Sequence, residues 1–472
     1  MTTDHPLALG GRRDDALDHA CAIIRRAWHE FDHPRPSEPA DDPGLTSLFA
    51  QRLPEHGMDP LAGLDIAANV LDRSYAQSRP RYLAFIGASG LEIGVLADML
   101  AATYDVNLAV DSRAASRVEE QAVRWLGDYL GFPADGGSFT SGGQVSNLTA
   151  LAAARERAFP GSRRTGMSGI RATVYVSAEA HVSVRRAVEL LGLGSDCVRT
   201  IALDGERRMD ATGLRDQVAA DTAAGFTPMA VVATGGTTLT GAVDPLDAIA
   251  DVAAEHGMWM HVDGAYGLAA AGLERTRGMF AGLDRADSVS IDAHKWLFVP
   301  KACSAILVRD HVPLVRMFSH NEAYMPHEGG ALNPVDATLE YSRPVRSLKL
   351  WLAFLVYGAE RMRAAVSQHL DIAQWLYDAA AVDPEFTVLP HRPQLSITPL
   401  QHTLPGCPDV DAHNMALTFA MQKDGRVFIS PAQIDGRSYL RPCFVNYRTD
   451  ESDAQAVLDV ARELGRSICP HH

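Results

Sequence analysis

Short apolar runs alternate with helix-like runs through the middle of the chain, from about Arg81 to Asp310. The strand-like runs are Thr173 to Val176, Met229 to Ala233, Met258 to Val262, Ser288 to Ile291 and Ala305 to Val308. Between two of them, Pro245 to His256 is bounded by Asp244 and Gly257, which are typical of a helix start and a helix end. This alternation predicts a mostly parallel sheet covered by helices, with ligands bound at the carboxyl ends of the strands.

The alternating region is flanked by two stretches of different character. In residues 1–80 apolar positions recur at helix spacing, as in the series Leu17, Ala20, Ile23, Ile24 and Trp28. This stretch is too short to bury much surface alone. Towards the other end, a long helix-like stretch from Ser347 to Leu376 leads into short strands and a final helix near Asp453 to Gly465. We predict a helical segment at 1–80, a large domain at 81–376 and a small α+β domain at 377–472.

The charge balance and the cysteines narrow the class of protein. A formal net charge of −15 disfavours nucleic acid or an anionic membrane as a partner. No run approaches the roughly 18 apolar residues of a membrane span, and the N-terminal stretch shows no secretory signal. The six cysteines are scattered, with no Cys-x-x-Cys pair to suggest a metal or redox site. We therefore expect a cytoplasmic protein without a metal ion.

Lysine is rare in this chain, which has four lysines and 39 arginines. Lys295 lies in Ser290-Ile-Asp-Ala-His-Lys-Trp296, directly after a strand-like run, whereas the other lysines lack a preceding histidine and such a lead-in. Those lysines are Lys301, Lys349 and Lys423. Lysine can lose its proton and attack a carbonyl, but arginine stays protonated. Lys295 is therefore the predicted covalent partner of a carbonyl group.

Three further motifs suit an anionic aromatic ligand. The loop Phe139-Thr-Ser-Gly-Gly-Gln-Val-Ser-Asn-Leu-Thr149 feeds an alanine-rich helix whose N–H groups suit a phosphate; an ordinary loop-to-helix junction is the alternative. Asp263 ends a buried strand in His261-Val-Asp-Gly-Ala-Tyr266 and needs a cation or a donor. A protonated pyridine nitrogen, a helix cap or an arginine partner would each satisfy it. His181 can stack on an aromatic ring or be an ordinary hydrogen-bonded residue.

The order of these motifs, with Gly235-Gly-Thr-Thr238 and Asp244 between His181 and Asp263, resembles the group II decarboxylases. These enzymes depend on pyridoxal 5′-phosphate (PLP). The resemblance runs from about residue 81 to 449. It implies the α/β fold of type I PLP-dependent transferases, with a mostly parallel sheet in the large domain, a small C-terminal α+β domain and a helical N-terminal segment. It also implies an L-amino acid substrate, in specialised metabolism.

The resemblance implies a role for each matching residue. Lys295 would form the internal aldimine, and His181 would stack on the pyridine ring. Asp263 would pair with the ring nitrogen and keep it protonated, so that the ring withdraws electrons strongly. The residues that it places around the cofactor are Gly143, Gln144, His181, Thr238, Asp244, Asp263, His294 and Lys295. Arg441 matches an arginine that grips the substrate carboxylate in glutamate decarboxylases; a structural ion pair is the alternative.

Family position also assigns a substrate pocket and a partner. Residues 82–89, including Phe85, and residues 104–107 would line the pocket, but their side chains do not name an amino acid. Arg113 stands where the family usually has proline. Near the entrance it would favour an acidic or phosphorylated substrate; a solvated surface arginine is the alternative. The family's site lies at a dimer interface, so we expect a homodimer in which residues 1–80 wrap the partner.

Ala331 departs from the family pattern. Counted back from Arg343 and Lys349, it takes the place of a loop tyrosine that protonates Cα after carbon dioxide leaves, and alanine has no proton to give. Tyr324 or Tyr341 could substitute only if the loop ran differently. We therefore predict decarboxylation coupled to oxidative deamination by molecular oxygen, which gives an aldehyde. The alternatives are plain decarboxylation to an amine with another proton donor, β-elimination from a cysteine conjugate, and a silent scaffold subunit.

Overall fold

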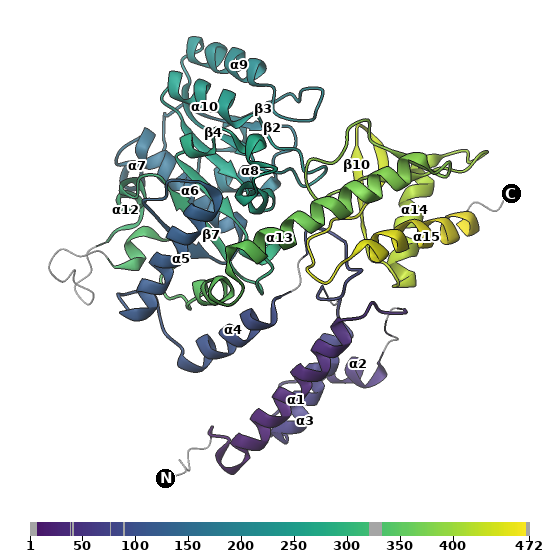
Figure 1. The fold of residues 1–472 in the computed structure, drawn as a ribbon. Coiled ribbons are helices and arrows are strands. Elements are labelled where there is room, and N and C mark those ends of the chain that lie inside the picture. Colours follow the sequence, from purple (N-terminus) through teal and green to yellow (C-terminus); the bar gives the residue numbers. More distant parts are fainter. Residues whose placement is uncertain are drawn as a thin grey trace.

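The computed structural model describes residues 7–37, 39, 42–75, 77–87, 90–320 and 333–468. A seven-stranded sheet lies between layers of helices, a four-stranded sheet forms a second unit, and three helices form an N-terminal segment (Figure 1). Within the described ranges, none of the helices combines the length and the apolar character that crossing a membrane requires.

The large sheet has the strand order β1-β7-β6-β5-β4-β2-β3. Its strands are β1 (Gly136–Thr140), β2 (Ala172–Ser177), β3 (Val198–Ile201), β4 (Thr227–Thr234), β5 (Trp259–Asp263), β6 (Ser288–Ile291) and β7 (Ser304–Val308). Neighbours from β3 to β6 run parallel, whereas β7 is antiparallel to both β6 and β1. The predicted mostly parallel sheet is confirmed. The edge strands β1 and β3 carry no continuous apolar run that would predict them.

The sheet separates two apolar cores because successive side chains of a strand point to opposite faces. Along β4, Val231 and Ala233 pack in one core with α5 and α10, whereas Ala230 and Val232 pack in another with α6, α8 and α12. The helices of this domain are α4 (Glu92–Tyr104), α5 (Ala114–Leu130), α6 (Gly143–Ala158), α7 (Ser162–Thr165), α8 (Val182–Leu190), α9 (Ala211–Ala223), α10 (Leu246–Glu255), α11 (Ala293–Trp296) and α12 (Val312–Phe318). Short 3-10 helices lie at Gly10–Arg12, Ser195–Cys197, Gly267–Gly272, Arg277–Phe280, Leu283–Arg285 and Pro334–Ala337.

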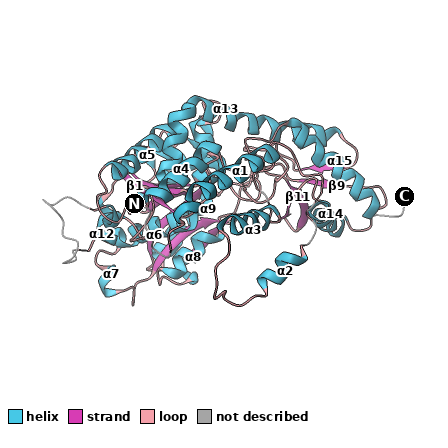
Figure 2. Cartoon of the chain, turned by 90° about the horizontal axis from the view of Figure 1, so that it is seen from below, coloured by secondary structure: helices cyan, strands magenta, loops and turns pink. Residues whose placement is uncertain are grey.

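The second sheet is antiparallel, in the order β10-β11-β9-β8. Its elements are β8 (Phe386–Val388), β9 (Leu400–His402), α14 (Val410–Asp424), β10 (Ser430–Ile434), β11 (Arg437–Arg441) and α15 (Glu451–Ile468). In Figure 2, α14, α15, β9 and β11 gather at one end of the molecule, away from α7 and α12. This is the predicted small α+β unit.

Helix α13 (Ser347–Val382) connects the two cores. Leu350 packs in the core of the large sheet, and Leu376 packs in the core of the small one. The helix is kinked at Gly358, where φ is 71°, a value that glycine adopts readily. The boundary predicted after residue 376 falls inside α13.

The N-terminal segment stands apart from the rest of the chain (Figure 1). It consists of α1 (Arg13–Phe31), α2 (Pro43–Phe49) and α3 (Pro60–Asp72). In the fully described α1, Ala16 is the single buried residue, and Leu17 is 55% exposed. Arg448 ties the segment to the small domain through Asp32, at 3.2 Å. The other residues of the apolar stripe, Ala20, Ile23, Ile24 and Trp28, are partly exposed. A single chain therefore buries this stripe only in part.

Candidate active site

A pocket opens where the carboxyl ends of β5 and β6 meet the N-terminus of α6. Its lining includes six of the residues that the sequence analysis assigns to the cofactor: Gly143, Gln144, His181, Thr238, Asp263 and Lys295. These residues span more than 150 positions of the chain. The parallel sheet brings them together because the ends of its central strands share one edge.

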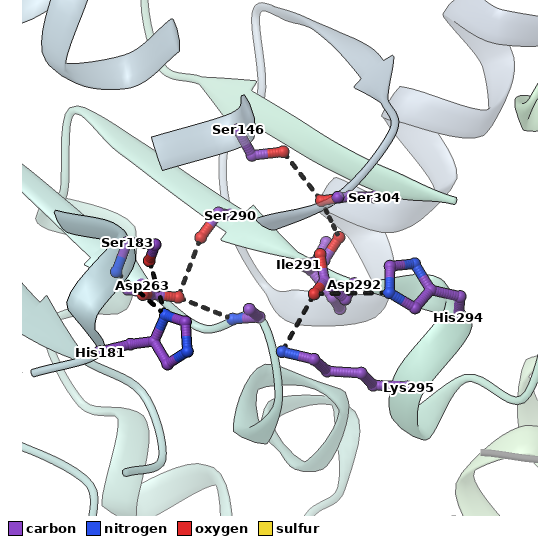
Figure 3. Close-up of polar contacts among 12 residues, drawn as sticks. Ser146, His181, Ser183, Asp263, Ser290, Ile291, Asp292, His294, Lys295 and Ser304 are labelled. Atoms are coloured by element: carbon purple, nitrogen blue, oxygen red, sulfur yellow. Dashed lines mark hydrogen bonds and ion pairs between the residues drawn. The ribbon is translucent and has the colours of Figure 1, made fainter. Parts of the chain in front are cut away.

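Asp263 is the last residue of β5 and is only 6% exposed. Its Oδ2 accepts a hydrogen bond from Nδ2 of Asn147 at 2.8 Å. Its Oδ1 accepts from the backbone N–H of Ala265 at 3.2 Å and lies 3.3 Å from Oγ of Ser290 (Figure 3). These neutral groups orient the carboxylate, and no lysine or arginine of the described residues forms a salt bridge with it.

His181 precedes α8 and caps it. Its Nδ1 accepts from the backbone N–H of Ser183 at 3.2 Å and lies 2.8 Å from the Ser183 hydroxyl (Figure 3). Burial lowers the pKa of His181, although the carboxylate of Asp263 opposes this effect. The imidazole is therefore held neutral at neutral pH, with a flat ring at the pocket.

Lys295 lies on α11, the short helix that follows β6. Its Nζ is 3.0 Å from Oδ2 of Asp292, and His294 Nε2 is 3.7 Å from the same oxygen (Figure 3). Burial works to raise the pKa of Asp292, but Lys295 and then His294 outweigh it and hold this pKa below its usual value. Asp292 is therefore an ionised carboxylate that fixes Nζ at the pocket.

The start of α6 forms one wall of the pocket. A Cβ on Gly143 would lie 3.1 Å from both carboxylate oxygens of Asp292 and 3.1 Å from Cβ of Ala265, so a side chain here would be crowded. The N–H groups of the first helical turn have no partner within the helix and suit an anion. Gln144 is oriented by Arg186, whose Nη1 lies 3.3 Å from Gln144 Oε1.

Two residues assigned to the cofactor lie outside the pocket lining. Asp244 accepts the backbone N–H groups of Met209 and Thr234, both at 2.7 Å, and burial raises its pKa to about 6. His294 is turned towards the backbone of Cys303, with Nδ1 2.9 Å from the carbonyl oxygen. Both therefore contact the segments that build the pocket, and neither is part of its surface.

Arg441 and Phe85 contact one another beside the pocket. Arg441 ends β11 and is 3% exposed; its Nη1 donates to the carbonyl oxygen of Phe85 at 2.8 Å. Its Nε and Nη2 have no hydrogen-bond partner among the described residues. Burial lowers the pKa of Arg441, with opposing contributions from Cys443 and from Tyr266, which lines the pocket. Phe85 itself is 61% exposed, with φ at 52°.

Of the two departures from the family pattern, Arg113 lies within the described residues and Ala331 does not. Tyr324 also lies outside the described residues. Arg113 precedes α5 with φ at 55°, and its N–H donates to Asp111 at 2.9 Å. Proline cannot adopt this φ, so the arginine goes with a different local backbone.

Seven residues of the pocket lining were not assigned by the sequence analysis: Asn147, Ser183, Thr234, Gly236, Ala265, Tyr266 and Asp292. Asp292 could have been found, because it is a charge directly after a buried strand, much as Asp263 is a charge at the end of one. For Asn147 and Ser183 the motifs were identified, but nothing local indicated that their side chains contact one another.

Comparison with known proteins defines the class. Residues 50–397 match the model of the pyridoxal-dependent decarboxylase conserved domain. The chain therefore belongs to this family, the predicted group II decarboxylases, and is a PLP-dependent amino acid decarboxylase. The pocket is chemically suited to PLP, because it offers a lysine, a buried carboxylate, a flat imidazole and a helix N-terminus.

Relatives with different substrates resemble the chain to a similar degree. It is 30% identical over 443 residues to an aromatic-L-amino-acid decarboxylase of Bacillus atrophaeus, covering 92% of this chain and 91% of the relative. It is 31% identical over 430 residues to an L-2,4-diaminobutyrate decarboxylase of Rhizobium meliloti, covering 89% and 85%. The crystal structure of mouse CSAD superposes with a TM-score of 0.90 at 25% identity, covering 96% of this chain and 98% of that one.

Proposed function

We propose that Lys295 is the residue that binds PLP covalently, with Asp292 holding its Nζ in position. The 3.0 Å contact between the two side chains supports this role. Bound PLP supplies an electron sink for the electron pair that remains at Cα when the carboxylate leaves. Asp263 would hold a proton on the pyridine nitrogen, since its carboxylate is buried and has no salt-bridge partner among the described residues, and His181 would stack on the ring.

The phosphate would lie against the start of α6. We assign it to the N–H groups of Gly143 and Gln144, with Thr238 on the facing wall of the pocket. Asp244 and His294 would act one layer further out, by holding the backbone of the strand ends that carry the pocket. Their contacts with Thr234 and Cys303 support this assignment.

Arg441 would bind a carboxylate of the substrate. Its buried guanidinium has Nε and Nη2 free of hydrogen bonds among the described residues, and these two atoms suit a planar two-oxygen partner. Phe85 would flank the same substrate through the contact between its carbonyl oxygen and Nη1. Aromatic and diaminobutyrate decarboxylases resemble this chain about equally, so the shared amino acid carboxylate is the group that Arg441 is proposed to recognise.

The product would be an aldehyde, and the residue that carries this proposal is Ala331. Where a proton donor is missing at Cα, the electron pair persists and can reduce oxygen. The balanced reaction consumes an L-amino acid, O₂ and water and releases an aldehyde, carbon dioxide, ammonia and hydrogen peroxide. Tyr266 lines the pocket, but its hydroxyl lies 2.6 Å from Ser396 Oγ and burial raises its pKa well above the usual value, which makes it a poor acid.

The decisive experiment incubates the holoenzyme with pooled amino acids and cysteine conjugates. Carbon dioxide, oxygen uptake, amine, aldehyde and thiol are followed together. We expect oxygen uptake matched by aldehyde and hydrogen peroxide. Amine as the sole product, without oxygen uptake, would contradict the proposal; thiol release without carbon dioxide would indicate β-elimination. A scaffold subunit would give none of these products. It would also lack the yellow absorption of PLP bound to a lysine, which in the enzyme should be lost in Lys295→Ala.

A tyrosine restored at position 331 should raise the amine-to-aldehyde ratio. Ala331→Tyr supplies a phenol where a proton is needed, and product analysis under air measures the ratio. Leu339→Tyr is the matched control. Leu339 lies eight positions further along the chain and is 48% exposed, so this substitution adds the same phenol at the surface. An unchanged ratio in Ala331→Tyr, or an equal rise in both variants, would count against the role of position 331.

We also propose a homodimer. The exposed apolar side chains of the N-terminal helices, such as Leu17 at 55%, Phe49 at 68% and Leu71 at 71%, support a partner that covers them. Sedimentation of the full chain, with and without Leu17→Glu, measures whether this surface carries the association.

A further inference from the structure

Asn147 forms four hydrogen bonds in the interior beside the pocket. Its Nδ2 donates to Oδ2 of Asp263 at 2.8 Å and to Oγ of Ser183 at 3.0 Å. Its Oδ1 accepts from Oγ of Ser290 at 2.9 Å and from Nε2 of His261, also at 2.9 Å. The residue is 1% exposed, so both hydrogens and both lone pairs of its amide are used within the protein.

The carboxylate of Asp263 determines which way this amide faces. A carboxylate only accepts, so the NH₂ group of Asn147 must point towards Asp263, and its oxygen must then accept from His261 and Ser290. His261 is therefore protonated on Nε2, and its Nδ1 accepts from the Ser288 hydroxyl at 2.8 Å. Burial lowers the pKa of His261 to about 4, which agrees with a neutral ring.

The same amide directs the hydroxyl of Ser183. The second hydrogen on Nδ2 occupies a lone pair of Ser183 Oγ, so the hydroxyl hydrogen is free to point at Nδ1 of His181, 2.8 Å away. That nitrogen already accepts the backbone N–H of Ser183. His181 therefore carries its proton on Nε2. Figure 3 shows Asp263 and His181 with Ser183 and Ser290 around them.

We propose that Asn147 is a positioning residue that sets the carboxylate of Asp263 and the hydroxyl of Ser183 together, and so prepares both groups that the proposed function places on the PLP ring. This proposal rests on the proposed function, which assigns Asp263 and His181 to the PLP ring. Asn147 would not touch the reacting atoms. The competing explanation is that Asn147 only satisfies buried polar groups and contributes to stability alone.

The small domain offers a matched control for a purely structural asparagine. Asn414 is fully buried; its Oδ1 accepts the backbone N–H of His402 at 2.8 Å, and its Nδ2 donates to the carbonyl oxygens of His402 and Val410 at 3.0 and 2.8 Å. Asn147→Ala and Asn414→Ala each remove a buried amide with several hydrogen bonds. Both should lower the thermal midpoint, so stability alone does not separate the two explanations.

The first measurement is the affinity of the apoprotein for PLP, followed by the absorption of the bound cofactor. We expect Asn147→Ala to weaken binding about tenfold or more, as loss of a residue that orients a ligand typically does, and Asn414→Ala to leave affinity unchanged. Wild-type affinity in a folded Asn147→Ala protein would overturn the proposal. Retention of covalent PLP by Lys295→Ala would instead overturn the proposed function, so the two failures are distinguishable.

The second measurement uses Asn147→Asp, which preserves the volume of the side chain. It places a second carboxyl group within hydrogen-bonding distance of Asp263, and two such groups share a proton. PLP affinity should then depend on pH differently from the wild type. The other titratable groups around Asp263 are His181, His261, Asp292 and Lys295, which are the same in both proteins. A pH profile identical to the wild type would overturn the proposal.

Discussion

Arg441 carries a buried guanidinium whose N–H groups are only partly used by hydrogen bonds to the described residues. Its guanidinium is 3% exposed, lacks a salt bridge among the described residues, and is held by one hydrogen bond to the Phe85 carbonyl oxygen at 2.8 Å. A buried charge without a counterion is unfavourable, and a bound carboxylate would relieve that cost. The free edge of this guanidinium therefore suits substrate binding better than a structural ion pair.

Arg441→Lys should raise KM while the fold is retained, because an ammonium keeps the charge but lacks the planar fork. We expect kcat/KM to fall about 10- to 100-fold, the equivalent of about 1.5–3 kcal/mol for a hydrogen bond to a charged group. Steady-state kinetics of carbon dioxide release measure this effect. Arg437→Lys is the control, since Arg437 lies on the same strand, is half exposed and pairs with Asp411 at 2.9 Å. Equal losses in both variants would contradict the assignment.

At the scale of residues, the sequence predicted the cofactor, but it did not predict which side chains contact one another in the site. Rarity singled out Lys295, and a charge at the end of a buried strand singled out Asp263, as the residues that we propose for the cofactor. Asn147 was not singled out, although it lay within an identified motif, because its partner Asp263 is 116 positions away. The contact depends on how α6 packs across the strand ends.

At the scale of elements, a buried ion pair anchors the segment between the undescribed residues 321–332 and α13. Arg343 donates from Nη1 to Glu119 Oε2 at 2.7 Å, and its Nη2 lies 2.7 Å from Oε1. Their side chains are 1% and 9% exposed. The carbonyl oxygen of Arg343 also accepts the N–H of Leu108. One residue thus fixes the segment to α5 and to the stretch that precedes it.

Arg343→Met should destabilise the protein by about 3–5 kcal/mol, because it leaves Glu119 buried without a counterion. Urea unfolding measures the change. The double variant with Glu119→Gln should recover part of the loss. Arg117→Met is the control, because Arg117 lies on α5, the helix that carries Glu119. Its contact with Glu120 at 2.6 Å is exposed, so the loss of stability should stay within about 1 kcal/mol. Equal losses for Arg343→Met and Arg117→Met would refute the anchoring role.

The sequence predicted the elements with clear periodicity and missed those without it. Five strands and the long helix α13 were predicted, since each carries an apolar pattern of its own. The strands β1 and β3 lie at the edges of the sheet, where half of the residues are polar or exposed. Strand β7 runs antiparallel to its neighbours. Its direction depends on its place in the sheet, and no local sequence pattern indicates that place.

At the scale of the whole molecule, His369 joins segments that are far apart in the chain. Trp296 Nε1 donates to its Nδ1 at 2.9 Å, and its Nε2 donates to the carbonyl oxygen of Asn446 at 2.9 Å. The side chain of Asn446 in turn donates to the carbonyl oxygen of Arg79 at 2.8 Å. The imidazole can serve both partners only when neutral, and burial lowers its pKa to about 4.

Acid should therefore destabilise the fold through His369. The folded pKa of about 4 lies below the unfolded value of 6.5, so the stabilisation is complete above pH 6.5 and is lost as the pH falls towards 4. Each pH unit in this window removes up to about 1.4 kcal/mol. His369→Gln keeps an acceptor and a donor without titrating, so its stability should fall less steeply. Urea unfolding of both apoproteins at pH 7, 6 and 5 measures the slopes, and equal slopes would exclude this role.

The sequence by itself determined the class of fold and the cofactor, and it predicted which lysine binds that cofactor, because periodicity, residue rarity and motif order are properties of short stretches of chain. The tertiary structure decided which side chains meet. It placed Asn147 between Asp263 and Ser183, set Asp292 against Lys295, and kept Asp244 and His294 out of the pocket lining. It also left Nε and Nη2 of Arg441 without a hydrogen-bond partner among the described residues. These outcomes depend on the packing of helices across strand ends, and therefore on contacts between residues far apart in the sequence.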